Sequence, residues 1–314
     1  MNISRGFSVA EVLIVLLLSA GLLAMTTGVL NNLLRSSRQI QQLNQLQQNA
    51  QLVLSLFHNE LQHAGFWGGV SLNDIRDSAS SVVAPAVDCL LPQIDSGSFP
   101  APDSGFIPLY AATAAGGRQL NCISDAIAGS EFLQIKRLGG QILLSDELRT
   151  NRFYFYSEWP QGQFVSAATG NSGWYFPYQH QVFYLQRQQG PDGSVPVLMR
   201  KRLIRNQSGQ ATMTTDSVLD GVERLHFEFA IDSDLDGQAD YVLATDKMQL
   251  QHWQQQQARI LGIRFHILLR STSPDHNYVN TLHYQMGEQL FDAPADHYRR
   301  LLLTSSITFQ NSLF

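Results

Sequence analysis

Four aspartates in one short stretch are the residues of this chain best suited to binding a metal ion. Asp232, Asp234 and Asp236 alternate, a glycine follows, and Asp240 stands at the ninth position counted from Asp232. Aspartates at positions 1, 3 and 5 with glycine at position 6 are typical of the first half of an EF-hand calcium loop. The twelfth position, where that loop carries a bidentate glutamate, is Leu243. Two interpretations stay open: a Ca²⁺ site formed by the four aspartates, or an Asx-rich turn between strands.

The two cysteines, Cys89 and Cys122, are the next residues whose chemistry matters. They form no C-x-x-C motif and have no histidine partner at zinc spacing. In an oxidising compartment a single structural disulfide is the natural interpretation, and two free buried thiols are the alternative. A bridge closing a loop of this size would contribute about 3–4 kcal/mol.

No arrangement typical of an active site is visible, so we do not expect an enzyme. The nine histidines are scattered, and no H-E-x-x-H, G-x-S-x-G, P-loop or dinucleotide-binding turn occurs. We expect His266, in a strand-like run, to be a packed or surface residue rather than a ligand. The four tryptophans, Trp67, Trp159, Trp174 and Trp253, fit core positions better than a sugar- or partner-binding surface. A net charge of −5 does not indicate nucleic-acid binding.

The N-terminal stretch Arg5-Gly6-Phe7-Ser8-Val9-Ala10-Glu11 opens a long apolar run that ends near Leu30. The run is long enough for a helix that crosses a bilayer, which needs about 20 residues. Glu11 is its only charged residue. Because a buried acid costs at least ~2.5–3.5 kcal/mol at the bilayer centre, Glu11 indicates a function.

This stretch has two interpretations: a signal peptide or plain signal anchor that tolerates Glu11 near the membrane interface, or a segment that is cut to give a new amino terminus. A secretory signal peptide has a shorter apolar region, about 7–15 residues, followed by a small-residue cleavage site. The run here is longer and leads directly into another helical pattern. We favour a cut between Gly6 and Phe7, which would make Glu11 the fifth residue of a new amino terminus. One helical turn away, its carboxylate can offset a buried amine and suits the helix dipole.

The element that positions these N-terminal residues is one long helix. Apolar residues continue at three- and four-residue steps beyond the membrane run, namely Ile40, Leu43, Leu46, Ala50, Val53, Phe57, Leu61 and Ala64. No proline interrupts from Phe7 to Ala64, which predicts a helix of about 58 residues and about 87 Å. Gly65 is expected to cap it. A coiled-coil dimer is the alternative, but strict heptads and flanking charges are missing.

The rest of the chain predicts a β-rich domain. The segment from Val70 to Asp125 is rich in turn residues, and we expect it to form long loops on the surface. Strand-like runs follow at 132–135, 152–156, 181–185, 196–200, 223–229 and 260–270, and a last strand spans Tyr298 to Asn311. The runs at 181–185 and 196–200 form a hairpin around Gly190, Asp192 and Gly193. We therefore expect an α+β fold, with the long helix packed on an antiparallel sheet.

The N-terminal stretch resembles the type III signal of type IV prepilins and of type II secretion pseudopilins. That signal is a short basic leader ending in glycine, then phenylalanine, and glutamate at the fifth mature position. The resemblance implies that a prepilin peptidase removes the leader after Gly6 and N-methylates Phe7. It also implies that Glu11 helps the subunit dock in a helical filament.

Further segments resemble the PilW-type minor pilins, in the same order along the chain. They are the end of the helix with the segment Ala64–Gly68 that leads the chain out of it, residues 182–184, residues 198–200, residues 260–270 and the Arg299-Arg300 tail. Such chains often carry a cysteine directly after the exit, where this chain has Gly69. Many also carry an Asp/Gly-rich turn at the place of Asp232–Asp240, which fits a hairpin as well as an ion.

These resemblances imply a pilin-like organisation: leader 1–6, transmembrane or filament-core helix 7–30, amphipathic continuation 31–65, and a periplasmic β-rich domain 66–314. The protein would sit in the inner membrane with one span and enter an extracellular pilus, a filament of adhesion and twitching motility. Its partners would be the prepilin peptidase, other minor pilins, the major pilin, the inner-membrane assembly platform and a tip adhesin. Alternatives are a minor pseudopilin of type II secretion, or a calcium-dependent adhesin displayed on a pilin stem.

Overall fold

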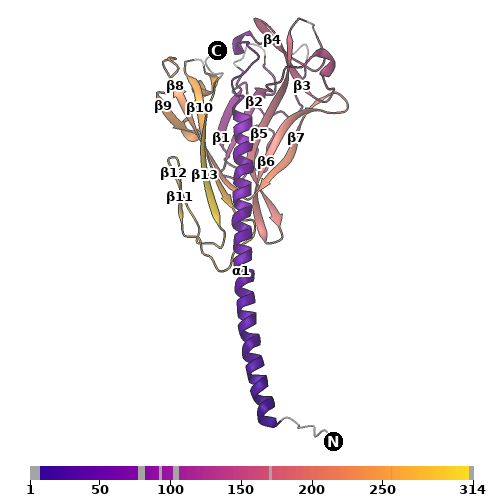
Figure 1. Ribbon diagram of the computed structural model, residues 1–314. Coiled ribbons are helices and arrows are strands. Elements are labelled where there is room, and N and C mark those ends of the chain that lie inside the picture. The colour runs from indigo at the N-terminus through magenta and orange to yellow at the C-terminus, as the bar shows by residue number, and fades with distance from the viewer. Residues whose placement is uncertain are drawn as a thin grey trace.

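The protein is built along one long helix. In the computed structural model, which describes residues 8–76, 82–91, 94–101, 106–169, 172–255 and 257–310, helix α1 spans Val9–Leu61. Its 53 residues correspond to about 80 Å at ~1.5 Å per residue. Figure 1 shows that the N-terminal part of α1 projects away from the strands, whereas its C-terminal part lies among them.

The helix ends earlier than its apolar pattern predicts. The C-cap is Gln62 rather than Gly65, which lies three residues further on with φ +81°. The N–H of Gln62 still donates to the carbonyl of His58, but the N–H of Ala64 donates to that of Leu61. The i−4 hydrogen bonds therefore give way to tighter i−3 bonds, which often terminate helices. The prediction of a helix to Ala64 capped by Gly65 is wrong by one turn.

The larger sheet has seven antiparallel strands (Figure 1). They are β1 (Leu109–Thr113), β2 (Glu131–Leu138), β3 (Phe153–Glu158), β4 (Gln161–Val165), β5 (Trp174–Gly190), β6 (Gly193–Arg205) and β7 (Ala211–Asp220). The order is β1-β2-β5-β3-β4, and β6 pairs with both β5 and β7. The β5–β6 pair, closed between Gly190 and Gly193, confirms the predicted hairpin.

The smaller sheet has four strands in the order β13-β10-β8-β9. Its strands are β8 (Val222–Asp232), β9 (Tyr241–Ala244), β10 (Arg259–Arg270) and β13 (Arg300–Thr308), and β11 (His283–Met286) pairs with β12 (Gln289–Asp292) in a separate hairpin. The short helices are η1 (Leu72–Asp74), η2 (Ser145–Glu147), η3 (Thr245–Lys247) and α2 (Leu250–Gln254). The predicted α+β class is confirmed, but the strands divide into two main sheets instead of one.

The two sheets are connected at a single glycine. Gly221 separates β7 from β8 and has φ +83°. Its N–H donates to the carbonyl of Pro196, and its carbonyl accepts from the N–H of Arg270, each at 2.7 Å. A Cβ at this position would lie 2.4 Å from the Arg270 carbonyl oxygen. Only glycine combines this backbone conformation with so close an approach.

The C-terminal part of α1 packs between the two sheets. The ring of Phe57, which is fully buried, lies 5.3 Å from Phe183 of β5 and 5.4 Å from Phe265 of β10. From the predicted apolar stripe, the buried members are Leu46, Ala50, Val53, Phe57, Leu61 and Ala64. Ile40 and Leu43 are 54% and 41% exposed. The domain already contacts α1 at Gln42, which donates to the carbonyl of Ser273, and it buries apolar side chains of the helix only from Leu46 onward. The predicted apolar stripe therefore begins too early.

Candidate assembly surface and acidic loop

The exposed apolar part of α1 is the surface best suited to assembly. We call it the stem and define it as residues Val9–Leu43, none of which is buried. Large side chains point outward along it, with Leu17 76% and Met25 72% exposed. The helix is long and apolar enough to cross a membrane, and its most apolar window has no buried residue. So large an apolar surface needs lipid or other helices around it.

Glu11 lies at the first turn of the stem and caps its own helix. Its carboxylate accepts the N–H of Ser8 at 2.9 Å, and its own N–H donates to the Ser8 hydroxyl at 3.3 Å. This reciprocal pair is a capping box. The Ser8-x-x-Glu11 spacing is its sequence signature, a local signal from which the capping role of both residues could have been predicted. Gly6 and Phe7, the predicted cleavage residues, lie outside the described residues.

The loop between β8 and β9 is organised by its own aspartates. Asp232 is buried, and its two carboxylate oxygens accept the N–H groups of Leu235 at 2.7 Å and Gly237 at 3.0 Å. Asp240, at the other end of the loop, accepts both the N–H and the hydroxyl of Ser233. Those hydrogen bonds lower the pKa of Asp240, which is therefore ionised at neutral pH.

The structure brings three of the four predicted metal ligands together. Asp232, Asp234 and Asp240 each offer a carboxylate oxygen, and these oxygens lie within 4.8 Å of one another. Asp236 is not in this group, and its carboxylate accepts the N–H of Gln238. Leu243, at the twelfth position, pairs with β8. Three carboxylates could supply part of the six to eight oxygens that Ca²⁺ takes, with water completing the shell.

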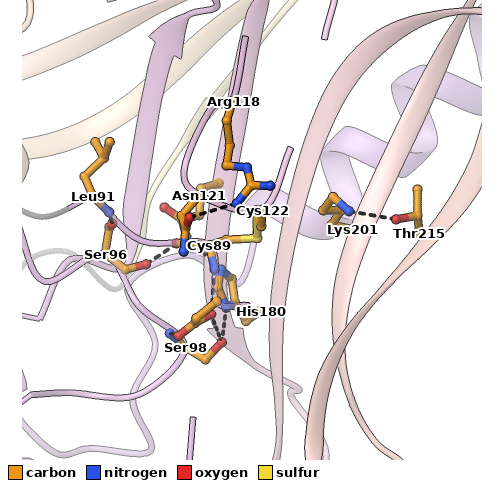
Figure 2. The surroundings of a disulfide bond; sticks show 12 residues. Cys89, Leu91, Ser96, Ser98, Arg118, Asn121, Cys122, His180, Lys201 and Thr215 are labelled. Atoms are coloured by element: carbon orange, nitrogen blue, oxygen red, sulfur yellow. Dashed lines mark hydrogen bonds between the residues drawn. A yellow bond between two sulfur atoms is a disulfide. The ribbon is translucent and has the colours of Figure 1, made fainter. Parts of the chain in front are cut away.

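A disulfide joins Cys89 and Cys122, with their Cα atoms 4.8 Å apart. Figure 2 shows a polar cluster beside it. The hydroxyl of Ser98 donates to Asp88 and lies 2.8 Å from His180 Nδ1. Although serine and histidine here are in contact, both are fully buried. Burial, helped by the nearby Lys136, holds the pKa of His180 well below its usual value, so the imidazole is neutral. We interpret the cluster as support for the fold.

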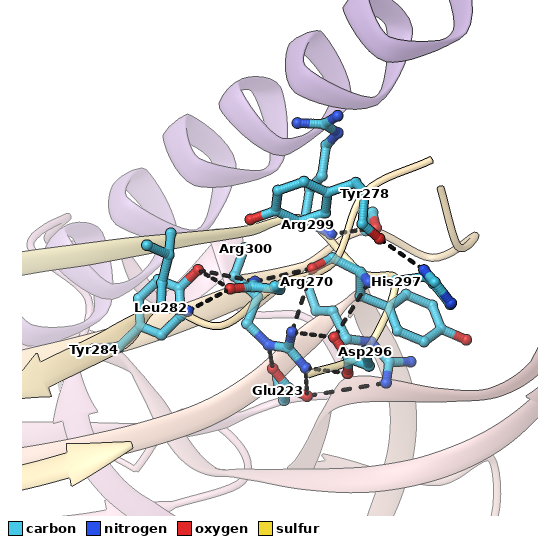
Figure 3. Close-up of polar contacts among 12 residues, drawn as sticks. Glu223, Arg270, Tyr278, Leu282, Tyr284, Asp296, His297, Arg299 and Arg300 are labelled. Atoms are coloured by element: carbon cyan, nitrogen blue, oxygen red, sulfur yellow. Dashed lines mark hydrogen bonds and ion pairs between the residues drawn. The ribbon is translucent and has the colours of Figure 1, made fainter. Parts of the chain in front are cut away.

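The Arg299-Arg300 tail also has a structural role. The side chain of Arg300 is fully buried between two carboxylates, those of Glu223 at the start of β8 and Asp296 before β13. Its guanidinium donates two hydrogen bonds to each of them, at 2.6–3.0 Å (Figure 3). Such bidentate pairs are the strongest type of charged hydrogen bond. They hold the start of β13 in the smaller sheet.

The tryptophans were predicted to pack in the core. Trp67 and Trp253 are buried, but Trp159 and Trp174 are 82% and 54% exposed, which contradicts the prediction for those two. Trp159 stands in the turn between β3 and β4, and Trp174 is the first residue of β5, so both lie at strand ends. Of the two positions left open for His266, the structure shows the packed one: the side chain is buried and its ring is hydrogen-bonded to Thr304.

A second buried histidine connects the two sheets. His226 Nδ1 of β8 lies 2.7 Å from the carboxylate of Glu131 in β2. Burial lowers the pKa of this imidazole, but the hydrogen bond and charge of Glu131, with Glu228 and Asp246, raise it by more, so it ends above its usual value. No sequence pattern distinguishes His226 from the other histidines, since Glu131 is distant in the chain.

Comparison with known proteins identifies a relationship in the C-terminal part. Residues 182–311 match the family model described as Type IV Pilus-assembly protein W. The match includes most of β5 and every later strand, but not α1. No curated protein and no solved structure matches the chain significantly. The match relates the chain to a type IV pilus family and supports a role in pilus assembly.

Proposed function

We propose that the protein is a minor pilin that a prepilin peptidase cleaves and that takes part in priming type IV pili near their tip. The observation that carries the proposal is the exposed apolar stem on a domain that matches a pilus-assembly family. A membrane-anchored domain of another kind would need only enough helix to span the bilayer. This stem continues into the domain without a break.

In this mechanism the subunit is stored with its stem in the inner membrane and its domain in the periplasm. It enters the pilus when the stem moves from lipid into a bundle of similar helices, an apolar-to-apolar transfer with little hydrophobic cost. Cleavage after Gly6 would place a new amine one turn from Glu11. That carboxylate would offset the amine of its own chain or of a neighbour. Other minor pilins, the major pilin, the assembly platform and a tip adhesin would be the partners.

The first test is the intact mass and N-terminal residue of the protein isolated from membranes. We expect a chain that begins with N-methylated Phe7, and a chain that begins with Met1 when the prepilin peptidase gene is deleted. A chain that begins with Met1 while the peptidase is active would refute the proposal.

Glu11→Val separates docking from membrane insertion. We expect the variant to be cleaved and inserted normally but to be absent from sheared pili, because the carboxylate for the amine is missing. Leu22→Val, a change of similar size in the same stem, is the control and should enter pili. A type II secretion pseudopilin is the alternative, and deletion of the gene would then stop protein secretion and leave pili intact.

The three converging aspartates favour one second candidate, a calcium-dependent binding module displayed on a pilin stem. Calcium would then raise the melting temperature of the full chain in detergent, and Asp234→Ala would abolish that shift. The absence of a shift in the native chain would exclude this role.

A further inference from the structure

An open cleft of about 450 Å³ lies beside the C-terminal part of α1, where the helix meets β5 and β6. Five arginines line it, from β2, β6 and the residue before β3: Arg137, Arg152, Arg200, Arg202 and Arg205. Its volume is that of a small-molecule site. None of the assembly steps described above uses this cleft.

The arginines outnumber the carboxylates near them. Glu60 of α1 pairs with Arg137 at 2.8 Å, and Asp216 of β7 is shared by Arg200 and Arg202 at 3.3 and 3.0 Å. Five guanidinium groups less two carboxylates leave three positive charges among these residues. The whole chain, by contrast, has a net charge of −5. The cleft is therefore a local cationic site on an acidic protein, suited to an anion.

Two buried polar atoms of the cleft lining have no hydrogen-bond partner within the described chain: Gln181 Oε1 and Arg200 Nε. The orientation of the Gln181 amide is determined, because its Nε2 donates to acceptors on both Glu60 and Gln179, at 2.9 and 3.0 Å. Its oxygen is thus an unused acceptor, and Arg200 Nε is an unused donor. Buried groups of this kind normally have partners, so a ligand that displaces the side chains covering them and supplies a donor and an acceptor would complete them.

We propose that the cleft binds an acidic sugar, a small polyhydroxylated carboxylate. The carboxylate would pair with the exposed Arg152 and Arg202, since guanidinium groups match carboxylates in geometry and charge. A sugar hydroxyl would donate to Gln181 Oε1 and accept from Arg200 Nε. A bare oxyanion such as sulfate has no donor for the glutamine, and a neutral sugar has no charge for the arginines. This binding function goes beyond pilus assembly and does not depend on it.

The test is isothermal titration calorimetry of the full chain in detergent with D-glucuronate, with glucose and sulfate as comparators. We expect glucuronate to bind more tightly than either. Arg202→Ala should weaken binding by about tenfold or more, the effect of losing one charge-assisted hydrogen bond. Asp216→Asn should strengthen binding severalfold, because it removes the carboxylate that competes for two arginines. A gain of affinity cannot result from damage to the fold.

Lys201→Ala is the matched control. Lys201 lies between Arg200 and Arg202 in β6, but it does not line the cleft and its ammonium donates to Thr215. Removing this charge should leave glucuronate affinity unchanged. If sulfate bound as tightly as glucuronate, the site would hold an adventitious ion only. Tighter binding of a single-stranded oligonucleotide would reassign the cleft to nucleic acid. No binding to the folded chain, or equal loss in Lys201→Ala, would also overturn the proposal.

Discussion

At the scale of single residues, the charged groups of this protein stabilise the fold before any ligand is considered. Asp232 illustrates this, since both of its oxygens already accept backbone N–H groups within the acidic loop. Leu235 has a φ of +64°, in the left-handed region, so the backbone turns tightly around that carboxylate. The loop geometry therefore does not require an ion, although three carboxylates converge there.

We expect Asp232→Ala to destabilise the protein by about 1–3 kcal/mol even with calcium chelated, because two N–H groups lose their acceptor. Asp236→Ala, at an exposed position of the same loop, should change stability by less than about 0.5 kcal/mol. Urea denaturation in the presence of EDTA measures both. Full stability of the Asp232 variant would show that the loop does not depend on this carboxylate.

Lys136 is an ionisable side chain in a fully buried position, where burial disfavours its charged form. It is completely buried, donates to the carbonyl of Ile107 at 2.6 Å and lies 4.3 Å from the ring of Phe106. Burial lowers its pKa to about 7, against the opposite effects of Asp95 and Asp88. Between about pH 7 and pH 10 the unfolded chain holds a proton that the folded chain has lost. Stability should therefore rise with pH over this range.

Lys136→Met should flatten that pH dependence. The contribution of the lysine to the slope is at most about 1.4 kcal/mol per pH unit, and the variant lacks it. The measurement is the free energy of unfolding from pH 7 to pH 10 in the native chain and the variant. Parallel curves would mean that Lys136 is protonated in the folded state throughout the range.

At the scale of elements, α1 has two different parts. The stem presents apolar side chains to its surroundings, and one face of the part from Leu46 onward is buried against the two sheets. Phe57 is the contact through which both sheets hold the helix, since its ring touches β5, β8 and β10. In the proposed mechanism, an exchange of lipid for other helices around the stem would leave this buried face in place.

Phe57→Ala should cost about 3–5 kcal/mol of stability, the usual effect of emptying an aromatic core site. Leu52→Ala, on the same helix but 61% exposed, should cost less than about 1 kcal/mol. Denaturant unfolding of the domain, followed by tryptophan fluorescence in detergent micelles, compares the two. Equal effects of both changes would contradict the packing described for α1.

At the scale of the whole molecule, the two sheets have separate strand ladders but are connected by α1, by Gly221 and by hydrogen bonds between them. The N–H of Phe227 in β8 donates to Glu131 of β2, and the guanidinium of Arg270 in β10 donates to the carbonyl of Ser194 in β6. The backbone at Gly221 bonds to Pro196 of the larger sheet and to Arg270 of the smaller one. The His226–Glu131 contact adds a charged connection between them. Because the helix packs against both sheets, the domain should unfold as one unit.

Gly221→Ala should destabilise the whole domain by more than about 2 kcal/mol, since it adds a steric clash with Arg270 to the cost of a left-handed backbone. Gly193→Ala is the control: it also has positive φ, +112°, but a Cβ there meets no atom within 4 Å. The difference in unfolding free energy isolates the clash. Equal costs for the two variants would show that the backbone can shift at this connection.

Several features could be predicted from the sequence because their causes are local. Three- and four-residue spacing predicts α1, and alternation with a short glycine turn predicts the β5–β6 hairpin. The apolar run with Glu11 and the Ser8 capping signature are also local patterns. The strands that the sequence did not reveal, such as β7 and β9, are partly exposed, so their apolar alternation is weak.

Only the tertiary structure decided which distant residues meet. It excluded Asp236 from the carboxylate group and kept Asp240, and it placed Trp159 and Trp174 on the surface. It also brought arginines from separate strands into one cleft and His226 next to Glu131. Such contacts result from the packing of whole sheets around α1, the sum of many weak interactions that no single stretch of sequence contains.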